Sequence, residues 1–174
     1  MSNNTLTFID LGLPSKTMWA TTNVNETDEW GCDENVTLED AQKVGDIPSR
    51  QQWDELFKCC QVEYIQGNGS KKTKIGVRLT GKNGNVICIP VWYVCYKSWM
   101  AYPTNEWEVG EQTDSPWDTV LKCHIDCENR RYYFKETSSR HEVRSLYPTR
   151  VVKPKSEAWR YVDTDIDINV DDLY

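Results

Sequence analysis

The sequence has little phenylalanine and histidine, and it lacks a long apolar run. Its 174 residues include three Phe and two His, against eight Trp and nine Tyr. Without an apolar run of bilayer length, we expect no membrane-spanning helix and no membrane partner. Phe is the usual aromatic of a dry core, whereas Trp and Tyr carry polar groups and favour surfaces where one end of the ring meets water. The composition therefore indicates an aromatic binding surface, with about half of the rings in the core.

Neither an export signal nor a basic stripe is visible. The opening segment "MSNNTLTFIDLGLPSK" has no basic or apolar leader region, so we expect residence in the cytoplasm, with the seven cysteines reduced, or release by cell lysis within a virion. The net charge is -7, and no run of Lys and Arg is arranged to follow a phosphate backbone. Nucleic acid is therefore not an expected partner.

Two short helices are predicted early in the chain. The first begins near Thr37 and runs to about residue 44, and the second begins at Ser49, with Gln52 placed to complete a capping box. In the second helix, Trp53 and the apolar residues that follow it share one face. We expect this face to pack in the core, with Trp53 and Trp19 both buried.

Strands are predicted to follow the helices. Val77 and Leu79 alternate with polar residues, Asn83-Gly84 favours a type I′ turn, and residues 86–89 form the returning strand. Further strands are expected at 119–123, 131–134 and 149–152, while residues 91–102 look aromatic and irregular. Helices first and antiparallel strands after them predict an α+β fold class.

Four blocks in this order resemble the Fibrobacter succinogenes major paralogous domain family: "FIDLGLPSKTMWATTNV", "GDIPSRQQWDELFKCC", "VRLTGKNGNVICIP" and "LYPTRVV". The resemblance implies a C-type-lectin-like fold over residues 1–155, related to formylglycine-generating enzymes and to retroelement variable proteins. It also implies a binding or surface module from Bacteroidetes or one of their phages. The segment that would form the ligand face departs from the family pattern, so the framework carries over better than any site.

Metal, cofactor and catalytic sites are not expected. Cys123, His124 and Cys127 form one metal-like turn, but a structural zinc site needs a second pair of ligands. Cys123 and His124 would also point to opposite faces of a strand. The formylglycine-generating branch uses a cysteine pair, yet the residues around Cys123 and Cys127 do not match its site. Asp165, Asp167 and the residues after them lack the glycine and glutamate of a calcium loop. We therefore predict no enzyme activity, no metal and no cofactor.

The aromatic segment is the predicted binding surface. Rigid amphipathic rings supply a large contact area at low entropic cost. The alternative is that these rings simply build the core. The residues predicted to contact a ligand or partner are Tyr96, Trp99, Tyr102, Trp107 and Trp117.

Residues 156–174 form an acidic extension, with six acids and one base. Apolar and acidic residues alternate within it, as in a half-buried strand. We predict a docking strand that joins a sheet edge of its own domain or of a neighbouring chain, and so allows an oligomer; a disordered acidic tail is the rival interpretation. The residues that would face the sheet are Val162, Ile166, Ile168 and Val170.

The predicted function is a non-enzymatic binding or structural module of a phage virion, associated with the capsid or tail, with a lectin-like ligand face. Its partners would be other virion proteins or a host receptor or glycan. The alternative is a bacterial intracellular or surface-associated protein-binding domain of the same fold. An enzyme of the formylglycine-generating branch is a distant third.

Overall fold

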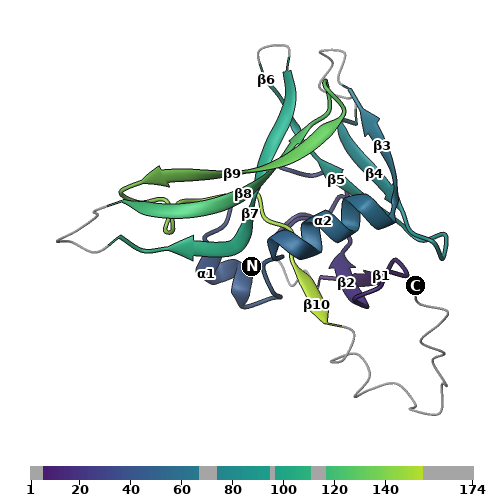
Figure 1. Ribbon diagram of the computed structural model, residues 1–174, viewed down its shortest axis with the longest axis horizontal. Helices are drawn as coiled ribbons and strands as arrows, with labels where there is room; N and C mark the ends of the chain where they lie inside the picture. Colours follow the sequence, from purple (N-terminus) through teal and green to yellow (C-terminus); the bar gives the residue numbers. More distant parts are fainter. Residues whose placement is uncertain (1–5, 67–73, 95–96, 111–116, 155–174) are drawn as a thin grey trace.

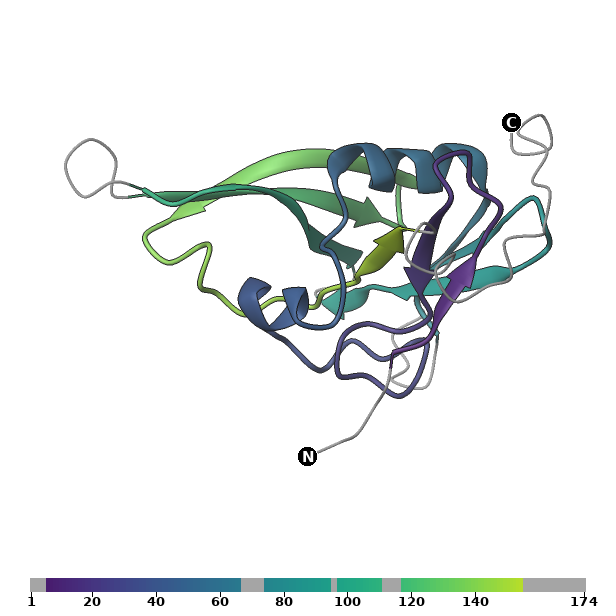
Figure 2. The same ribbon diagram turned by 90° about the horizontal axis from the view of Figure 1, so that it is seen from below.

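The computed structural model describes residues 6–66, 74–94, 97–110 and 117–154. These described residues form two helices and three antiparallel sheets (Figures 1 and 2). In chain order the elements are β1 (Phe8–Asp10), β2 (Thr17–Ala20), α1 (Leu38–Gln42), α2 (Arg50–Cys59), β3 (Gln61–Ile65), β4 (Gly76–Thr80), β5 (Val86–Pro90), β6 (Trp92–Val94), β7 (Lys97–Glu108), β8 (Asp118–Asp126), β9 (Arg131–Ser139) and β10 (Val152–Pro154).

The three sheets are small. Their strand orders are β1-β2-β10, β3-β4-β5 and β6-β7-β8-β9. Strand accounts for 45% and helix for 11% of the structure. The expectation of an α+β, C-type-lectin-like fold is therefore wrong in class, because the protein is mostly β. The main reason is the aromatic segment, which looked irregular but forms β6 and the 12-residue strand β7.

Both helices begin where their caps predict. The Thr37 side chain accepts a hydrogen bond from the Asp40 amide, and α1 starts at Leu38, the residue after Thr37. Ser49 and Gln52 form a complete capping box at the start of α2. These side chains satisfy backbone N–H groups that have no partner inside a helix. The prediction of two short early helices is confirmed.

The main core lies between α2 and the sheets. Trp19 and Trp53 are fully buried, as predicted, and their rings meet edge to face at 4.9 Å. Buried side chains from β4, β5, β7 and β8 complete this cluster. A second core joins α1, the chain after β9 and one face of β8, where Val120 and Tyr147 are buried. Aromatic and aliphatic burial of this kind is the principal stabilising contribution to such a fold.

The β4–β5 hairpin is confirmed, but its turn is not type I′. The strands pair from Gly76↔Pro90 to Thr80↔Val86, which leaves five residues between them. Gly84 has a φ of 88°, whereas Asn83 does not have a positive φ. The Asn83 side chain instead accepts from the Asn85 amide and donates to the Asp10 carbonyl. Local Asn bonding therefore shapes this loop and attaches it to β1.

Candidate functional site

One face of β8 changes from buried to exposed along the strand. Asp118, Val120 and Lys122 lie on the same face as His124 and Asp126, because strand residues alternate. The first three are buried under α1 and the segment after β9, but His124 and Asp126 are partly exposed. The opposite face of β8 carries the buried Cys123 and Ile125. The open end of the outer face is the candidate site.

Three rings stack across β7, β8 and β9 on this open face. The Trp99 and His124 rings are 6.3 Å apart at 13°, and those of His124 and Tyr133 are 4.8 Å apart at 11°. The register explains the stack, because His124 lies opposite Tyr133, and Trp99 lies opposite Asp126, two residues from His124. Such diagonal neighbours are within reach of aromatic side chains. We call Trp99, His124 and Tyr133 the aromatic ladder.

Charged groups border the aromatic ladder. The Arg131 guanidinium lies 4.9 Å from the Tyr133 ring centroid, and its Nε donates to Asp126 Oδ2 at 3.3 Å. Asn129 also donates to this carboxylate, and the hydrogen bonds and Arg131 lower the pKa of Asp126 even though burial opposes the shift. With Lys97, these residues enclose an open groove of about 350 Å³. The arginine over the ring and its carboxylate partner place the Arg131 side chain along one wall of the groove.

The surroundings of His124 favour its uncharged form. Burial lowers the pKa of His124, and the positive charges of Lys122 and Lys135 lower it further. Its Nε2 atom is buried and has no hydrogen-bond partner among the described residues. The ring therefore acts in this surface as a flat, uncharged spacer between Trp99 and Tyr133.

The predicted binding residues divide between surface and core. Trp99 is 41% exposed and lies in the groove, and Trp117 is 49% exposed but does not line it. Trp107 is half-buried against the second core. Tyr96 lies outside the described residues, as do the tail residues Val162, Ile166, Ile168 and Val170.

Tyr102 was wrongly placed on the binding surface. It is fully buried, its hydroxyl donates to the Pro90 carbonyl at 2.6 Å, and Asn23 donates to that hydroxyl at 3.0 Å. Burial raises the pKa of Tyr102 well above its usual value. Asn23 and Pro90, which are distant from Tyr102 in the sequence, thus satisfy the Tyr102 hydroxyl. The Tyr102 ring can therefore pack in the core beside Trp53.

The predicted contact residues did not include His124, Tyr133 or Arg131. His124 was considered as a metal ligand, and its placement on the face opposite Cys123 is confirmed. A period-two pattern through 120–126 and 131–135 would have put His124 and Tyr133 on outward faces. Their pairing across strands depends on the register, which the sequence does not specify.

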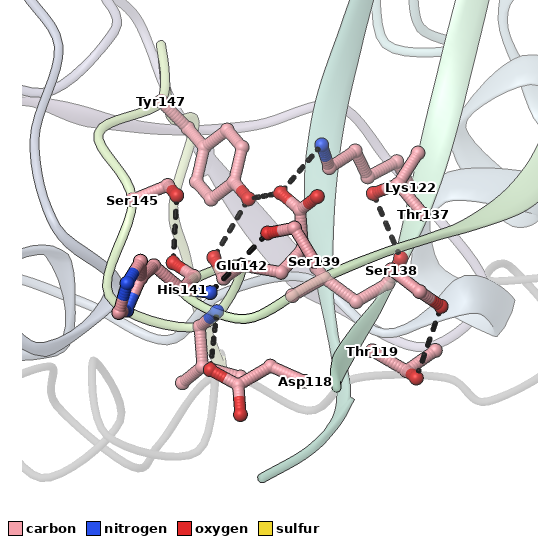
Figure 3. Close-up of polar contacts among 12 residues, drawn as sticks. Asp118, Thr119, Lys122, Thr137, Ser138, Ser139, His141, Glu142, Ser145 and Tyr147 are labelled. Carbon is pink, nitrogen blue, oxygen red and sulfur yellow. Dashed lines mark hydrogen bonds and ion pairs between the residues drawn. The ribbon is translucent and has the colours of Figure 1, made fainter. Parts of the chain in front are cut away.

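A second polar cluster lies further along the same face of β8 (Figure 3). The Lys122 ammonium is 3.3 Å from Glu142 Oε2 and 4.3 Å from the Tyr147 ring centroid. The Tyr147 hydroxyl also lies against Glu142. Asp118 accepts from the backbone amides of Gly110 and Val143. Every charge in this cluster is used to hold the segment after β9 against the sheet, so we assign it a structural role.

The described part of the chain offers no alternative chemical centre. Among the residues described, no group of three or more His, Cys, Asp and Glu side chains is placed to hold a metal ion. The six cysteines within the described ranges are free thiols. No helix in those ranges has the length and apolar character needed to cross a bilayer.

Comparison with known proteins leaves the site to be judged on its own geometry. The family resemblance stays a prediction. No protein family model, curated protein or solved structure matches the chain.

Proposed function

We propose that the chain is a non-enzymatic protein-binding module whose contact surface is the aromatic ladder together with Arg131. The observation that carries the proposal is the exposed, pre-stacked set Trp99–His124–Tyr133 within a groove. Trp, Tyr and Arg are the residues that most often dominate the binding energy of protein interfaces. Here they occur side by side on a rigid sheet rather than on a loop.

Pre-organisation supports this proposal. The rings already stack on one another, and Arg131 already contacts Tyr133 and Asp126. Ordering free side chains on binding costs roughly 0.5–1.5 kcal/mol for each. Because most of this ordering has occurred before the partner arrives, the surface loses little entropy when it binds.

The stacking also favours a protein over a sugar ring. His124 lies between two rings, so neither of its faces is open to a ligand. The mixed charges of Lys97, Arg131 and Asp126 around the groove are typical of a polar rim around a protein contact.

The chemistry of the cysteines supports a non-enzymatic role. Cys123 and Cys127 are the pair that the formylglycine-generating branch would need, and both are buried. Burial raises the pKa of Cys123 well above its usual value and that of Cys127 to about 12. Such thiols are protonated at neutral pH and are poor nucleophiles.

Affinity capture with the full chain tests the proposal. Tagged wild type, Trp99→Ala, Tyr133→Ala and Trp117→Ala would be used on a lysate of the source organism, and captured proteins quantified by mass spectrometry. We expect Trp99→Ala and Tyr133→Ala to weaken capture of a specific protein about 30-fold or more, as at an interface hot spot.

Trp117→Ala is the matched control, since Trp117 is at least as exposed as Trp99 but lies outside the groove. It should bind as wild type does. Equal capture by all four proteins, or loss only with Trp117→Ala, would contradict the proposal.

The resemblance adds a proposal for the setting, namely that the partner is another protein of a phage particle. Detection of the chain in purified particles at constant stoichiometry would support this setting. Recovery only from the particle-free cell extract would contradict it.

A further inference from the structure

The outer edge of β9 is open. β9 is a nine-residue strand that pairs with β8 along one side, and no strand in the described ranges pairs with its other side. The unpaired backbone groups of such an edge form a template for another strand. Long edge strands are usually covered or interrupted, so this nine-residue edge, with which no described strand pairs, is a candidate docking site for another strand.

The two faces of β9 differ in chemistry. Tyr132 and Phe134 point toward the main core and remain half-buried. They line a depression of about 570 Å³ between β9 and α2, whose Arg50, Asp54 and Lys58 form the other wall. On the opposite face Arg131 and Lys135 are exposed. A strand added to this edge would therefore need an apolar side and an acidic side.

The C-terminal segment Val162–Val170 has this pattern. It is nine residues long, the same length as β9, and Val, Thr or Ile alternates with Asp or Asn at every position. From Arg130 to Arg144 the chain holds five basic residues against two acidic ones. Opposite charges across a strand pair stabilise the pairing.

We infer that Val162–Val170 of one copy adds to the free edge of β9 in a second copy. We assign the donor to a neighbouring molecule because β10, the last described element before the segment, pairs with β2 in a separate sheet and not with β9. In Figures 1 and 2 the arrow of β10 also points away from the C-terminal end of β9. Reciprocal exchange of two segments closes a symmetric dimer.

An antiparallel register fits the apolar side. With Ile166 opposite Phe134, Ile168 lies opposite Tyr132. Directly opposite residues in antiparallel strands share a face and touch. Both isoleucines would then extend the partly exposed aromatic pair beside α2, where the depression has room for them.

The same register fits the acidic side. Asp165 lies opposite Lys135, and Asp167 is diagonal to both Lys135 and Arg131. The carboxylates remain at the surface, where they also discourage pairing between two free segments through like-charge repulsion. The test at Lys135 is independent of the aromatic ladder, because Lys135 does not line that groove.

Analytical ultracentrifugation of the full chain over a concentration series tests the inference. Wild type should approach twice the 20.3 kDa chain mass as concentration rises. Ile166→Pro removes a backbone donor from the centre of the added strand and should leave a monomer. Glu157→Pro is the matched control, outside the alternating segment, and should still form the dimer.

A charge swap tests the register. Lys135→Glu faces Asp165 with a like charge and should weaken the dimer roughly five- to tenfold. Adding Asp165→Lys should restore the wild-type dimer. Restoration is the result that a merely structural role for Lys135 would not produce.

Any of these outcomes would overturn the inference: a wild-type monomer at every concentration, an unchanged dimer in Ile166→Pro, or no rescue by the charge swap. Hydrogen exchange of amides 162–170 identifies the donor. Protection should grow with concentration. Full protection in a dilute monomer would show that the segment pairs within its own molecule and would overturn exchange between copies.

Discussion

Arg150 is the most deeply buried charge of the described chain. Its guanidinium donates to Asn23 Oδ1 and to the carbonyls of Ala20 and Cys88 at 2.7–2.8 Å. All three acceptors are neutral, and burial lowers the pKa of Arg150 to about 10. The fork of donors connects β2, the loop after it and β5, which are far apart in the sequence. Arg150 therefore joins parts of the core that no backbone ladder joins.

Arg150→Lys keeps the charge but replaces the planar fork with a single ammonium. We expect the free energy of unfolding to fall by about 3 kcal/mol, because buried carbonyls lose charged partners. Urea denaturation of wild type and Arg150→Lys measures this loss in the free energy of unfolding. Arg140→Lys, at an exposed position, is the control and should change the stability by less than about 0.5 kcal/mol. Equal effects of the two substitutions would contradict the role assigned to Arg150.

His124 makes the stability depend on pH. The folded chain binds a proton at His124 less readily than the unfolded chain does, because burial lowers the folded pKa. Its contribution to stability is therefore present above the unfolded pKa of about 6.5 and is lost as the pH falls through the lower folded value.

His124→Phe keeps a flat ring in the stack and removes this titration. We expect the loss of unfolding free energy between about pH 7.5 and about pH 5 to be smaller in His124→Phe than in wild type. Urea denaturation at the two pH values measures both. An identical pH dependence in the two proteins would show that His124 does not titrate as its burial requires.

At the scale of elements, the segment after β9 is held to the sheet by the Lys122–Glu142 pair. The Lys122 and Glu142 side chains are only 10% and 13% exposed. Glu142→Gln leaves a nearly buried ammonium without its counter-charge, so we expect a loss of about 3 kcal/mol in unfolding free energy. Urea denaturation of Lys122→Met/Glu142→Gln, which removes both charges, should show a smaller loss. If the double variant is no more stable than Glu142→Gln, the unpaired Lys122 ammonium is not the cause of the loss, and the role assigned to the ion pair is contradicted.

Local elements could be predicted from the sequence, and elements set by distant contacts could not. Thr37 and Ser49 cap their helices through neighbouring residues, so both helices were found. β7 was missed because Trp99, Pro103 and Trp107 break any simple alternation, and a register shift between Pro103 and Trp107 accommodates the break. Strand propensity depends on cross-strand packing, which the sequence does not show.

The candidate site was predicted only in part for the same reason. An aromatic surface was expected, and Trp99 belongs to it. Tyr102 looked equivalent, three residues away, but its burial depends on Asn23 and Pro90. His124 and Tyr133 join the surface through the register of three strands, and no local signal in the sequence carries that register.

At the scale of the whole molecule, the two cores, the aromatic ladder and the open edge of β9 occupy different parts of the fold. The inner faces of the sheets surround α2 in the main core, and the second core covers one end of the outer face of the β6–β9 sheet. The other end of that face presents the aromatic ladder, and the outer edge of β9 lies beside it. Binding of a partner and exchange of C-terminal segments would therefore use adjacent but different parts of one sheet.

Hydroxyl-radical footprinting of the partner-bound protein tests the central claim most directly. In the free chain, Trp99, Tyr133 and Trp117 are all exposed and should be oxidised. In the complex, oxidation of Trp99 and Tyr133 should fall sharply, because a bound protein excludes water from the centre of its contact surface, while oxidation of Trp117 stays at the level of the free chain. Unchanged oxidation of Trp99 and Tyr133 in a complex shown to be saturated would contradict the account.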